Sequence, residues 1–332
     1  MVITKTPFRM SFFGGGTDYQ PFFEEHGGSV ISTTFDKYAY VSVRHLPRFF
    51  DYRNQISYSK IETVKTVEDI NHPMVRNAMK YLDMHELHIS YDADLPARSG
   101  LGSSSSFAVG LLNAFHALKG HYVGNQQLAE EAIYVERNLC GESGGWQDQI
   151  AAAFGGLNRI NFLGSSFKVK PIIITKNRKQ QLEDNLMLYF TGFSRFSSNI
   201  ASVQVKATKD KTAELLEMLQ LVDVAEEILE NRRGDLDEFG RLLHETWRLK
   251  RGITDKISSD FLDEIYDKAM RNGALGGKLL GAGGGGFFVF YVPKDRQNQV
   301  REALSDLLYI PFSFENSGTE VMYYQPEDYE TI

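Results

Sequence analysis

The sequence has little cysteine, no excess of positive charge and no long hydrophobic run. Cys140 is the single cysteine in 332 residues, which excludes an intrachain disulfide and a cysteine-rich zinc site. The net charge of −7 disfavours nucleic acids and anionic membranes as partners. No apolar run approaches the ~18 residues of a membrane-spanning helix, and Lys5 and Arg9 stand where a signal peptide needs an apolar segment. These absences predict a cytoplasmic protein that binds neither nucleic acid nor membrane.

Internal repeats, low-complexity tracts and Pro- or Ser-rich linkers are also missing, so a domain boundary has to come from a change in pattern. Up to about residue 193 strand-like and helix-like segments are mixed, and from about 200 to 272 the pattern is helical. Strand signals return at 287–292 and 321–324. We therefore expect an α+β fold with two domains, residues 1–185 and 186–332.

Individual elements are indicated by periodicity and by turn residues. Alternation of apolar and polar residues predicts strands, and apolar residues at helical spacing predict helices. The expected strands cover 35–44, 87–91 and 185–193, and the expected helices cover 73–82, 103–120, 147–154 and a helix capped by Asn125 that runs through Leu139 to Gly141.

The 29 glycines are unevenly placed, and more than half of them fall in four clusters. The cluster in PARSGLGSSSS (96–106) precedes a predicted helix start. Small residues there leave backbone N–H groups and the positive end of a helix dipole free to meet one anion. Serine hydroxyls add ligands suited to phosphate and to Mg²⁺. The P-loop pattern fails because no Lys follows these glycines, and GAGGGG (281–286) precedes a strand, which is the wrong context for dinucleotide binding.

Two further segments contain candidate acids. In the segment around GESGGWQDQ (141–149), Asp148 suits orienting or deprotonating a hydroxyl, and Glu136, twelve residues earlier, suits Mg²⁺ ligation. Taken alone, each is also consistent with an ordinary helix position. In TPFRMSFFGGGTDYQ (6–20), Arg9 is positioned to reach phosphate and Asp18 to accept hydrogen bonds from sugar hydroxyls, although Asp18 capping its own turn is an equal alternative.

Together with GGKLLGAGGGG (276–286), these three segments in order resemble the GHMP kinase family of small-molecule kinases. The resemblance implies a two-domain fold: an N-terminal domain like domain 2 of ribosomal protein S5 and a ferredoxin-like C-terminal domain. It implies ATP and Mg²⁺ as cofactors, with Ser104 and Glu136 as metal ligands. It also implies Asp148 and Arg9 as catalytic residues, with the rate coming mostly from positioning and charge neutralisation.

The resemblance assigns the remaining site residues by position. ATP would be bound by Pro96, Ala97, Arg98, Ser99, Gly100, Leu101, Gly102, Ser103, Ser104 and Ser105. The sugar would be bound by Gly15, Gly16, Thr17, Asp18 and Gly284. Arg195 is a further candidate for substrate binding because of its charge, although an ordinary surface position is an equal alternative.

The first motif narrows the subgroup, because galactokinases carry Gly-Glu-His-Thr-Asp where this chain reads GGGTD (14–18). FFGGGTD, FDKYAYV and GLGSSSS are similar instead to kinases that phosphorylate the anomeric hydroxyl of D-glycero-D-manno-heptose 7-phosphate on the route to GDP-heptose. Such a substrate needs an extra cation for its phosphate, and Lys37, Arg98 and Arg195 are candidates. The alternatives are an L-fucokinase-like enzyme and a non-catalytic binding protein on the same fold. The oligomeric state stays open.

Overall fold

The computed structural model describes residues 1–97, 99–192, 197–207 and 210–326. Within these ranges the chain forms two sheets with helices packed against them, and no helix is both long and apolar enough to cross a bilayer. The larger sheet has nine strands in the described residues: β1 (Val2–Phe13), β2 (Gly28–His45), β3 (Asn54–Ser57), β4 (Ile61–Val64), β5 (Leu87–Ala93), β6 (Asn158–Leu163), β7 (Ser166–Pro171), β12 (Phe314–Glu315) and β13 (Glu320–Tyr324).

Strand β1 is central to the site because it lies between two helical layers. It pairs antiparallel with β2 on one side and β13 on the other, and contacts α3 as well as α8 and α9. Ten of its twelve residues are buried, and these include the polar residues Arg9 and Ser11. β1 ends at Phe13. The next residue, Gly14, has a φ of +76°, and a Cβ there would lie 1.9 Å from the carbonyl oxygen of Ser29, so only glycine fits this exit from the sheet.

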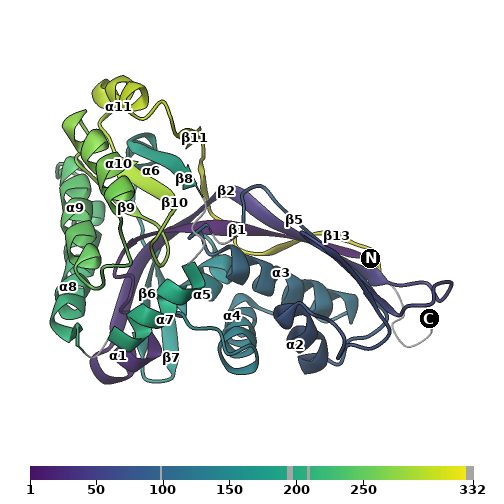
Figure 1. Cartoon of the computed structure of the whole chain (residues 1–332). Helices are drawn as coiled ribbons and strands as arrows, with labels where there is room; N and C mark the ends of the chain where they lie inside the picture. Colours follow the sequence, from purple (N-terminus) through teal and green to yellow (C-terminus); the bar gives the residue numbers. More distant parts are fainter. Residues whose placement is uncertain (98, 193–196, 208–209, 327–332) are drawn as a thin grey trace.

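Most helices of the first half lie along one face of the large sheet (Figure 1). They are α1 (Gln20–His26), α2 (Pro73–Tyr81), α3 (Ser103–Leu118), α4 (Asn125–Ile133), the π-helical turn η1 (Tyr134–Leu139), α5 (Gln147–Phe154) and α6 (Lys176–Asp184). The predicted helices at 73–82, 103–120 and 147–154 are confirmed. The predicted strands at 35–44 and 87–91 lie within β2 and β5.

The helix expected from Asn125 to Gly141 needs two corrections. Gly124 is the N-cap and Asn125 is already helical, without a side-chain capping bond. The α-helix also ends at Ile133 and continues as a π-helical turn, in which the amide of Cys140 donates to the carbonyl of Val135 at 2.8 Å. This wider turn carries Glu136, and such turns occur frequently at functional sites.

The second sheet is formed by β8 (Leu186–Gly192), β9 (Gly276–Leu279), β10 (Gly286–Tyr291) and β11 (Leu308–Ile310), in the order β11-β8-β10-β9. With helices between β8 and β9 and between β10 and β11, this is the ferredoxin-like arrangement expected. Its helices are α7 (Ser197–Ala207), α8 (Thr212–Glu230), α9 (Asp237–Arg251), α10 (Asp260–Arg271), the 3₁₀ turn η2 (Lys294–Arg296) and α11 (Gln297–Ala303). Figure 1 shows α8, α9 and α10 stacked beside this smaller sheet.

The last two strands of the segment 186–332 join the large sheet instead of the smaller one. Strand β12 pairs with β2 and β13 pairs with β1, so both complete the sheet of the first half. A strand pattern predicts an extended segment, but it does not say which sheet edge the segment will join. The two halves are also joined by a shared core, in which Phe12 and Phe13 contact Phe239 edge-on at centroid distances of 5.4 and 5.0 Å.

Candidate active site

A cavity of about 390 Å³ is lined by residues from both halves of the chain. From the first half come the end of β1, the turn after it, the loop before α3, the π-helical turn and the start of α5. From the second half come α7, α9, the end of β9 and the loop that follows it. The four glycine clusters singled out in the sequence all contribute residues to this cavity or border it.

Arg9 and Asp148 both line this cavity and contact each other. Arg9 lies on β1 and Asp148 in the first turn of α5. The Arg9 Nε and Nη2 atoms donate to the two carboxylate oxygens of Asp148, each at 2.8 Å, and Nη1 donates to the carbonyl of Gly100 at 2.6 Å. The Arg9 side chain is 4% exposed and that of Asp148 is 25% exposed. The two-pronged contact therefore fixes a carboxylate that faces the cavity in one orientation.

The loop before α3 has the backbone shape expected for anion binding. Gly100 and Gly102 have φ values of +83° and +76°, and the helix begins directly afterwards at Ser103. A Cβ on Gly100 would lie 2.3 Å from the carbonyl oxygen of Leu280, so this glycine also lets the C-terminal glycine loop approach. The first-turn N–H groups of α3, which have no partner within the helix, begin at the cavity wall formed by Gly102 and Ser103.

Glu136 is buried, with 1% of its surface exposed, so it does not lie on an exposed helix face. Its carboxylate accepts hydrogen bonds from the hydroxyls of Ser104 at 3.0 Å and Ser105 at 2.8 Å, and from the amide nitrogen of Gln149. Ser104 is the exposed member of this group. A serine hydroxyl and a carboxylate are hard oxygen ligands, so this pair fits Mg²⁺. No cluster of three or more His, Cys, Asp or Glu suited to a metal occurs among the described residues.

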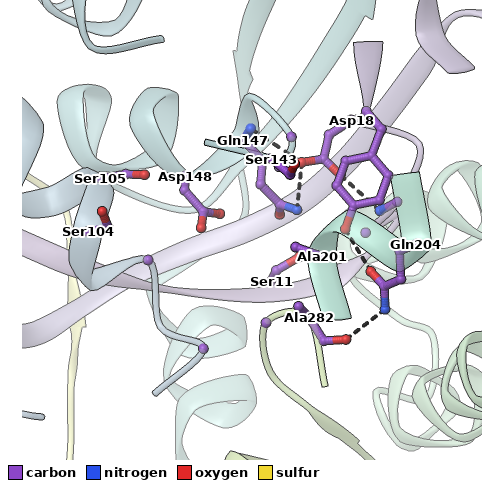
Figure 2. Close-up of a pocket in the computed structure, with 18 of the residues that line it drawn as sticks. Ser11, Asp18, Ser104, Ser105, Ser143, Gln147, Asp148, Ala201, Gln204 and Ala282 are labelled. Atoms are coloured by element: carbon purple, nitrogen blue, oxygen red, sulfur yellow. Dashed lines mark hydrogen bonds between the residues drawn. The ribbon is translucent and has the colours of Figure 1, made fainter. Parts of the chain in front are cut away.

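Asp18 closes the other end of the cavity. It is 1% exposed and accepts hydrogen bonds from the amide of Gly16 at 2.8 Å and from Gln147 Nε2 at 3.0 Å. Burial raises the pKa of Asp18, and the nearby charge of Asp148 acts in the same direction, while the bond from Gly16 opposes it. In Figure 2, Asp148 lies between Ser104 on one side and Gln147 and Asp18 on the other.

Two buried lysines, which were not predicted from the sequence, also line the cavity. Lys250 on α9 donates to the carbonyls of Leu279, at 3.3 Å, and Gly281, and is 5% exposed. Lys278 on β9 donates to the carbonyls of Ser11 at 2.9 Å and Phe12 at 3.0 Å, and is 1% exposed. Burial lowers the pKa of Lys250 to about 7 and that of Lys278 well below its ordinary value. The one sequence signal for Lys278 was its place within the C-terminal glycine motif.

A hydrogen-bonded bridge across one wall of the cavity was also missed. The hydroxyl of Tyr19 donates to the Gln204 side-chain oxygen at 2.7 Å, and the Gln204 side-chain nitrogen donates to the carbonyl of Ala282 at 2.6 Å. Gln204 lies on α7, so the bridge links this helix to the turn after β1 and to the C-terminal glycine loop (Figure 2). No local pattern in α7 indicated this contact.

Two of the predicted sugar-binding residues, Thr17 and Gly284, lie away from the cavity wall. Thr17 is fully buried, and its hydroxyl donates to the carbonyls of Gly14 at 2.8 Å and Ser29 at 2.9 Å, so it holds the turn instead of facing the cavity. The amide of Gly284 donates to the carbonyl of Ile257 at 2.9 Å, and Gly284 does not line the cavity. Gly15, Gly16 and Asp18 do line it.

The predicted ATP-binding segment divides in a similar way. Gly100, Gly102 and Ser103 to Ser105 line the cavity, whereas Pro96, Ala97, Ser99 and Leu101 do not. Leu101 packs instead into the core that joins the two halves. Lys37 bonds to Asp36 and does not line the cavity either, so it is not positioned as the substrate-phosphate cation. Arg98 and Arg195, the other two candidates, lie outside the described residues.

This combination of a glycine loop at a helix start, a serine–glutamate oxygen pair and an arginine-held carboxylate defines a phosphotransferase that acts on a small molecule. Two family models match the chain: GHMP kinases N terminal domain at residues 67–156 and GHMP kinases C terminal at residues 224–310. The chain belongs to the GHMP kinase family, and its relatives include sugar kinases.

Two relatives and one solved structure are similar to this chain over at least 90% of its length. The chain is 30% identical to the D-glycero-alpha-D-manno-heptose 7-phosphate kinase of Campylobacter jejuni, over 96% of this chain and 97% of the relative. It is 25% identical to the Arabidopsis thaliana bifunctional fucokinase/GDP-fucose pyrophosphorylase, over 90% of this chain but 31% of that longer protein. Among solved structures, a D-glycero-D-manno-heptose 1-phosphate kinase from Bacteroides thetaiotaomicron has a TM-score of 0.72 and 27% identity, covering 98% of this chain and all of that one.

Proposed function

We propose that this chain is an ATP- and Mg²⁺-dependent kinase that phosphorylates the anomeric hydroxyl of D-glycero-D-manno-heptose 7-phosphate to give the 1,7-bisphosphate. The observation that carries the proposal is the Arg9–Asp148 contact beside Gly100 and the start of α3. It puts a fixed carboxylate next to an anion-binding loop, as transfer of a phosphoryl group to a hydroxyl requires. The choice of sugar is supported by the Campylobacter jejuni relative, which matches along nearly its whole length.

In this proposal the anomeric hydroxyl oxygen attacks the γ-phosphorus of ATP. Asp148 accepts the proton of that hydroxyl, or orients the hydroxyl for the attack. A bond forms between the anomeric oxygen and phosphorus, and the bond from phosphorus to the β,γ-bridging oxygen breaks, with ADP as the leaving group. The Arg9 guanidinium keeps Asp148 in place through Nε and Nη2. Its positive charge also stabilises the negative charge on the transferring group.

The metal would be held by the Ser104 hydroxyl and the Glu136 carboxylate, which already lie 3.0 Å apart. When bound, Mg²⁺ neutralises charge on the phosphate oxygens. Ser105 and Gln149 donate to the second oxygen of Glu136 and so hold the carboxylate facing Ser104. The amides of the first turn of α3 would bind the phosphates directly.

The test is a screen of ATP consumption with five acceptors: heptose 7-phosphate, heptose 1-phosphate, the unphosphorylated heptose, L-fucose and galactose. The proposal predicts the highest kcat/KM for heptose 7-phosphate. Preference for heptose 1-phosphate would contradict the proposed anomeric acceptor, and preference for L-fucose would identify a fucokinase. ATP consumption that no sugar stimulates would contradict the sugar-kinase function altogether.

A further inference from the structure

Three polar side chains from distant parts of the sequence surround the Cα of Gly15 at the cavity wall. A Cβ placed on Gly15 would lie 3.5 Å from Lys278 Nζ, 3.7 Å from Ser11 Oγ and 3.9 Å from Gln147 Nε2. Ser11 comes from β1, Gln147 from the start of α5 and Lys278 from β9, and all three line the cavity. The absence of a side chain at Gly15 therefore leaves open a small space with polar groups on three sides.

Two of these side chains hold polar atoms with no hydrogen-bond partner among the described residues. They are Ser11 Oγ and Gln147 Oε1. Both side chains are buried, with exposed fractions of 4% for Ser11 and 8% for Gln147, so water does not readily replace the missing partners. A buried polar atom without a partner has lost its hydrogen bonds to water and gained none in return, so folded proteins rarely retain one without a reason. Both side chains border the opening at Gly15, which indicates that a ligand supplies the missing partners.

The orientation of Gln147 is fixed by its neighbour. Its side-chain nitrogen donates to the Asp18 carboxylate at 3.0 Å. A carboxylate only accepts hydrogen bonds, so the amide nitrogen has to face Asp18 and the amide oxygen has to face away. Gln147 Oε1 is therefore an acceptor that needs an external O–H or N–H donor, and the Ser11 hydroxyl is able to donate or accept.

Charge favours a neutral ligand here. Lys278 uses two of its N–H groups on the carbonyls of Ser11 and Phe12. Its pKa is lowered well below the ordinary value, first by burial and then by the charges of Lys250 and Arg9. A lysine in this condition binds a hydroxyl by donating or accepting one hydrogen bond, whereas a phosphate dianion calls for stable positive charge.

The opening lies beside the reacting centre. Arg9 and Ser11 are two residues apart on β1, so their side chains emerge on the same face, about 7 Å apart along the strand. Gln147 directly precedes Asp148. A ligand whose reacting hydroxyl contacts Asp148 therefore extends its neighbouring hydroxyl groups toward Ser11 and Gln147 across a single sugar ring.

From this geometry we infer that Ser11, Gln147 and Lys278 form a subsite for a ring hydroxyl of the acceptor sugar, and that glycine at position 15 is needed to admit it. The inference rests on the proposed sugar-kinase function and adds residues that position the acceptor. It assigns Ser11 and Gln147 Oε1 to substrate binding and gives them no part in the proton transfer.

Gly15→Ala tests the space. The φ of Gly15 is not in the left-handed region and the nearest atom to an added Cβ is 3.5 Å away, so the fold accepts alanine while the methyl fills the opening. We expect the sugar KM to rise at least about tenfold, with the ATP KM and the melting temperature unchanged, because one lost ligand contact of about 1.4 kcal/mol is a factor of ten. Gly124→Ala is the matched control, since its Cβ would meet nothing within 4 Å and it lies outside the cavity.

Ser11→Ala tests the unpartnered hydroxyl. Because this hydroxyl has no partner in the described protein, its removal leaves the melting temperature equal or slightly higher, while the sugar KM rises about 3–10-fold. Thr246→Val is its control, removing a hydroxyl that is also buried and without a partner but does not line the cavity. A merely structural role for Ser11 would change the melting temperature and leave the sugar KM alone.

Calorimetric binding of heptose 7-phosphate to the wild-type protein and the four variants separates this inference from the proposed function. Binding that weakens in Gly15→Ala and Ser11→Ala, but not in the controls, supports the subsite. Equal binding by all five proteins overturns the subsite and leaves the proposed function standing. No binding of this sugar to the wild-type protein contradicts both.

Discussion

Replacing Asp148 by Asn removes the charge that the buried Arg9 guanidinium contacts and leaves the shape of the site nearly unchanged. One of the two 2.8 Å bonds from Arg9 persists to the amide oxygen, and the bond from Arg9 to the Gly100 carbonyl is untouched. Breaking a buried ion pair costs about 3–5 kcal/mol. Because Asp148 is 25% exposed and half of the contact remains, we expect a smaller loss of unfolding free energy, about 1–3 kcal/mol.

The effect of Asp148→Asn on turnover should be larger. A positioned acid or base contributes about 10²–10⁴-fold to rate, and an amide cannot accept the proton of the sugar hydroxyl, so kcat should fall by about 10³-fold or more. The ATP KM should stay within about threefold, because the α3 amides and Ser104 are unaffected. The assay is coupled ADP production with heptose 7-phosphate, together with thermal unfolding of the same samples.

Glu226→Gln is the matched control for this experiment. Glu226 accepts bonds from Arg159 at 2.8 Å and Lys170 at 3.0 Å, its side chain is 11% exposed, and it does not line the cavity. This variant should lose a similar amount of stability and keep its kcat. Near-normal kcat in Asp148→Asn would refute the proposed role of Asp148. An equal loss of kcat in Glu226→Gln would show that destabilisation, not chemistry, explains the result.

Two further predictions concern the metal and the buried lysine. Ser104→Ala should raise the Mg²⁺ concentration needed for half-maximal activity severalfold, because it removes a metal ligand. Ser105→Ala removes a buried donor to the same Glu136 and should mainly lower the unfolding free energy, by about 1–2 kcal/mol. Equal metal dependence in Ser104→Ala and the wild type would contradict the ligand assignment. Lys250 has a pKa lowered to about 7, first by burial and then by Arg9, while Asp18 and Asp148 act in the opposite direction, and it also faces Lys278. An anionic ligand favours the protonated amine and raises this pKa, so ATP binding just above neutral pH should be accompanied by proton uptake. Calorimetry in two buffers of different ionisation enthalpy measures this uptake, and Lys250→Met should abolish it. Proton release on ATP binding would contradict the prediction.

Local chemistry explains which parts of the site could be predicted from the sequence. The start of α3 at Ser103 follows from two glycines and a run of serines, and the α5 start near Asp148 follows from a glycine turn. Each depends only on neighbouring residues, so short-range patterns are sufficient. The contacts between Arg9 and Asp148 and between Ser104 and Glu136 join segments that the family resemblance had already grouped.

The remaining features depend on how distant segments pack. In the sequence, Lys250 is one of several basic residues in the last turn of a charged helix, a position that predicts exposure to solvent. The close approach of α9 to β9 buries it. Ser11 and Gln147 look unremarkable in sequence, because their unpartnered atoms exist only once β1 and α5 lie together. Strand β13 shows a strand pattern, but its pairing with β1 spans almost the whole chain.

The proposed function is transfer of the γ-phosphoryl group of ATP to the anomeric hydroxyl of heptose 7-phosphate. Phosphorus NMR of the reaction mixture, with proton–phosphorus correlation, tests it most directly. Transfer to the anomeric hydroxyl should give one new sugar-phosphate signal coupled to the anomeric proton, with the signal of the 7-phosphate retained and ADP formed in equal amount. Inorganic phosphate as the only new product, or a new phosphate coupled to another sugar position, would contradict it.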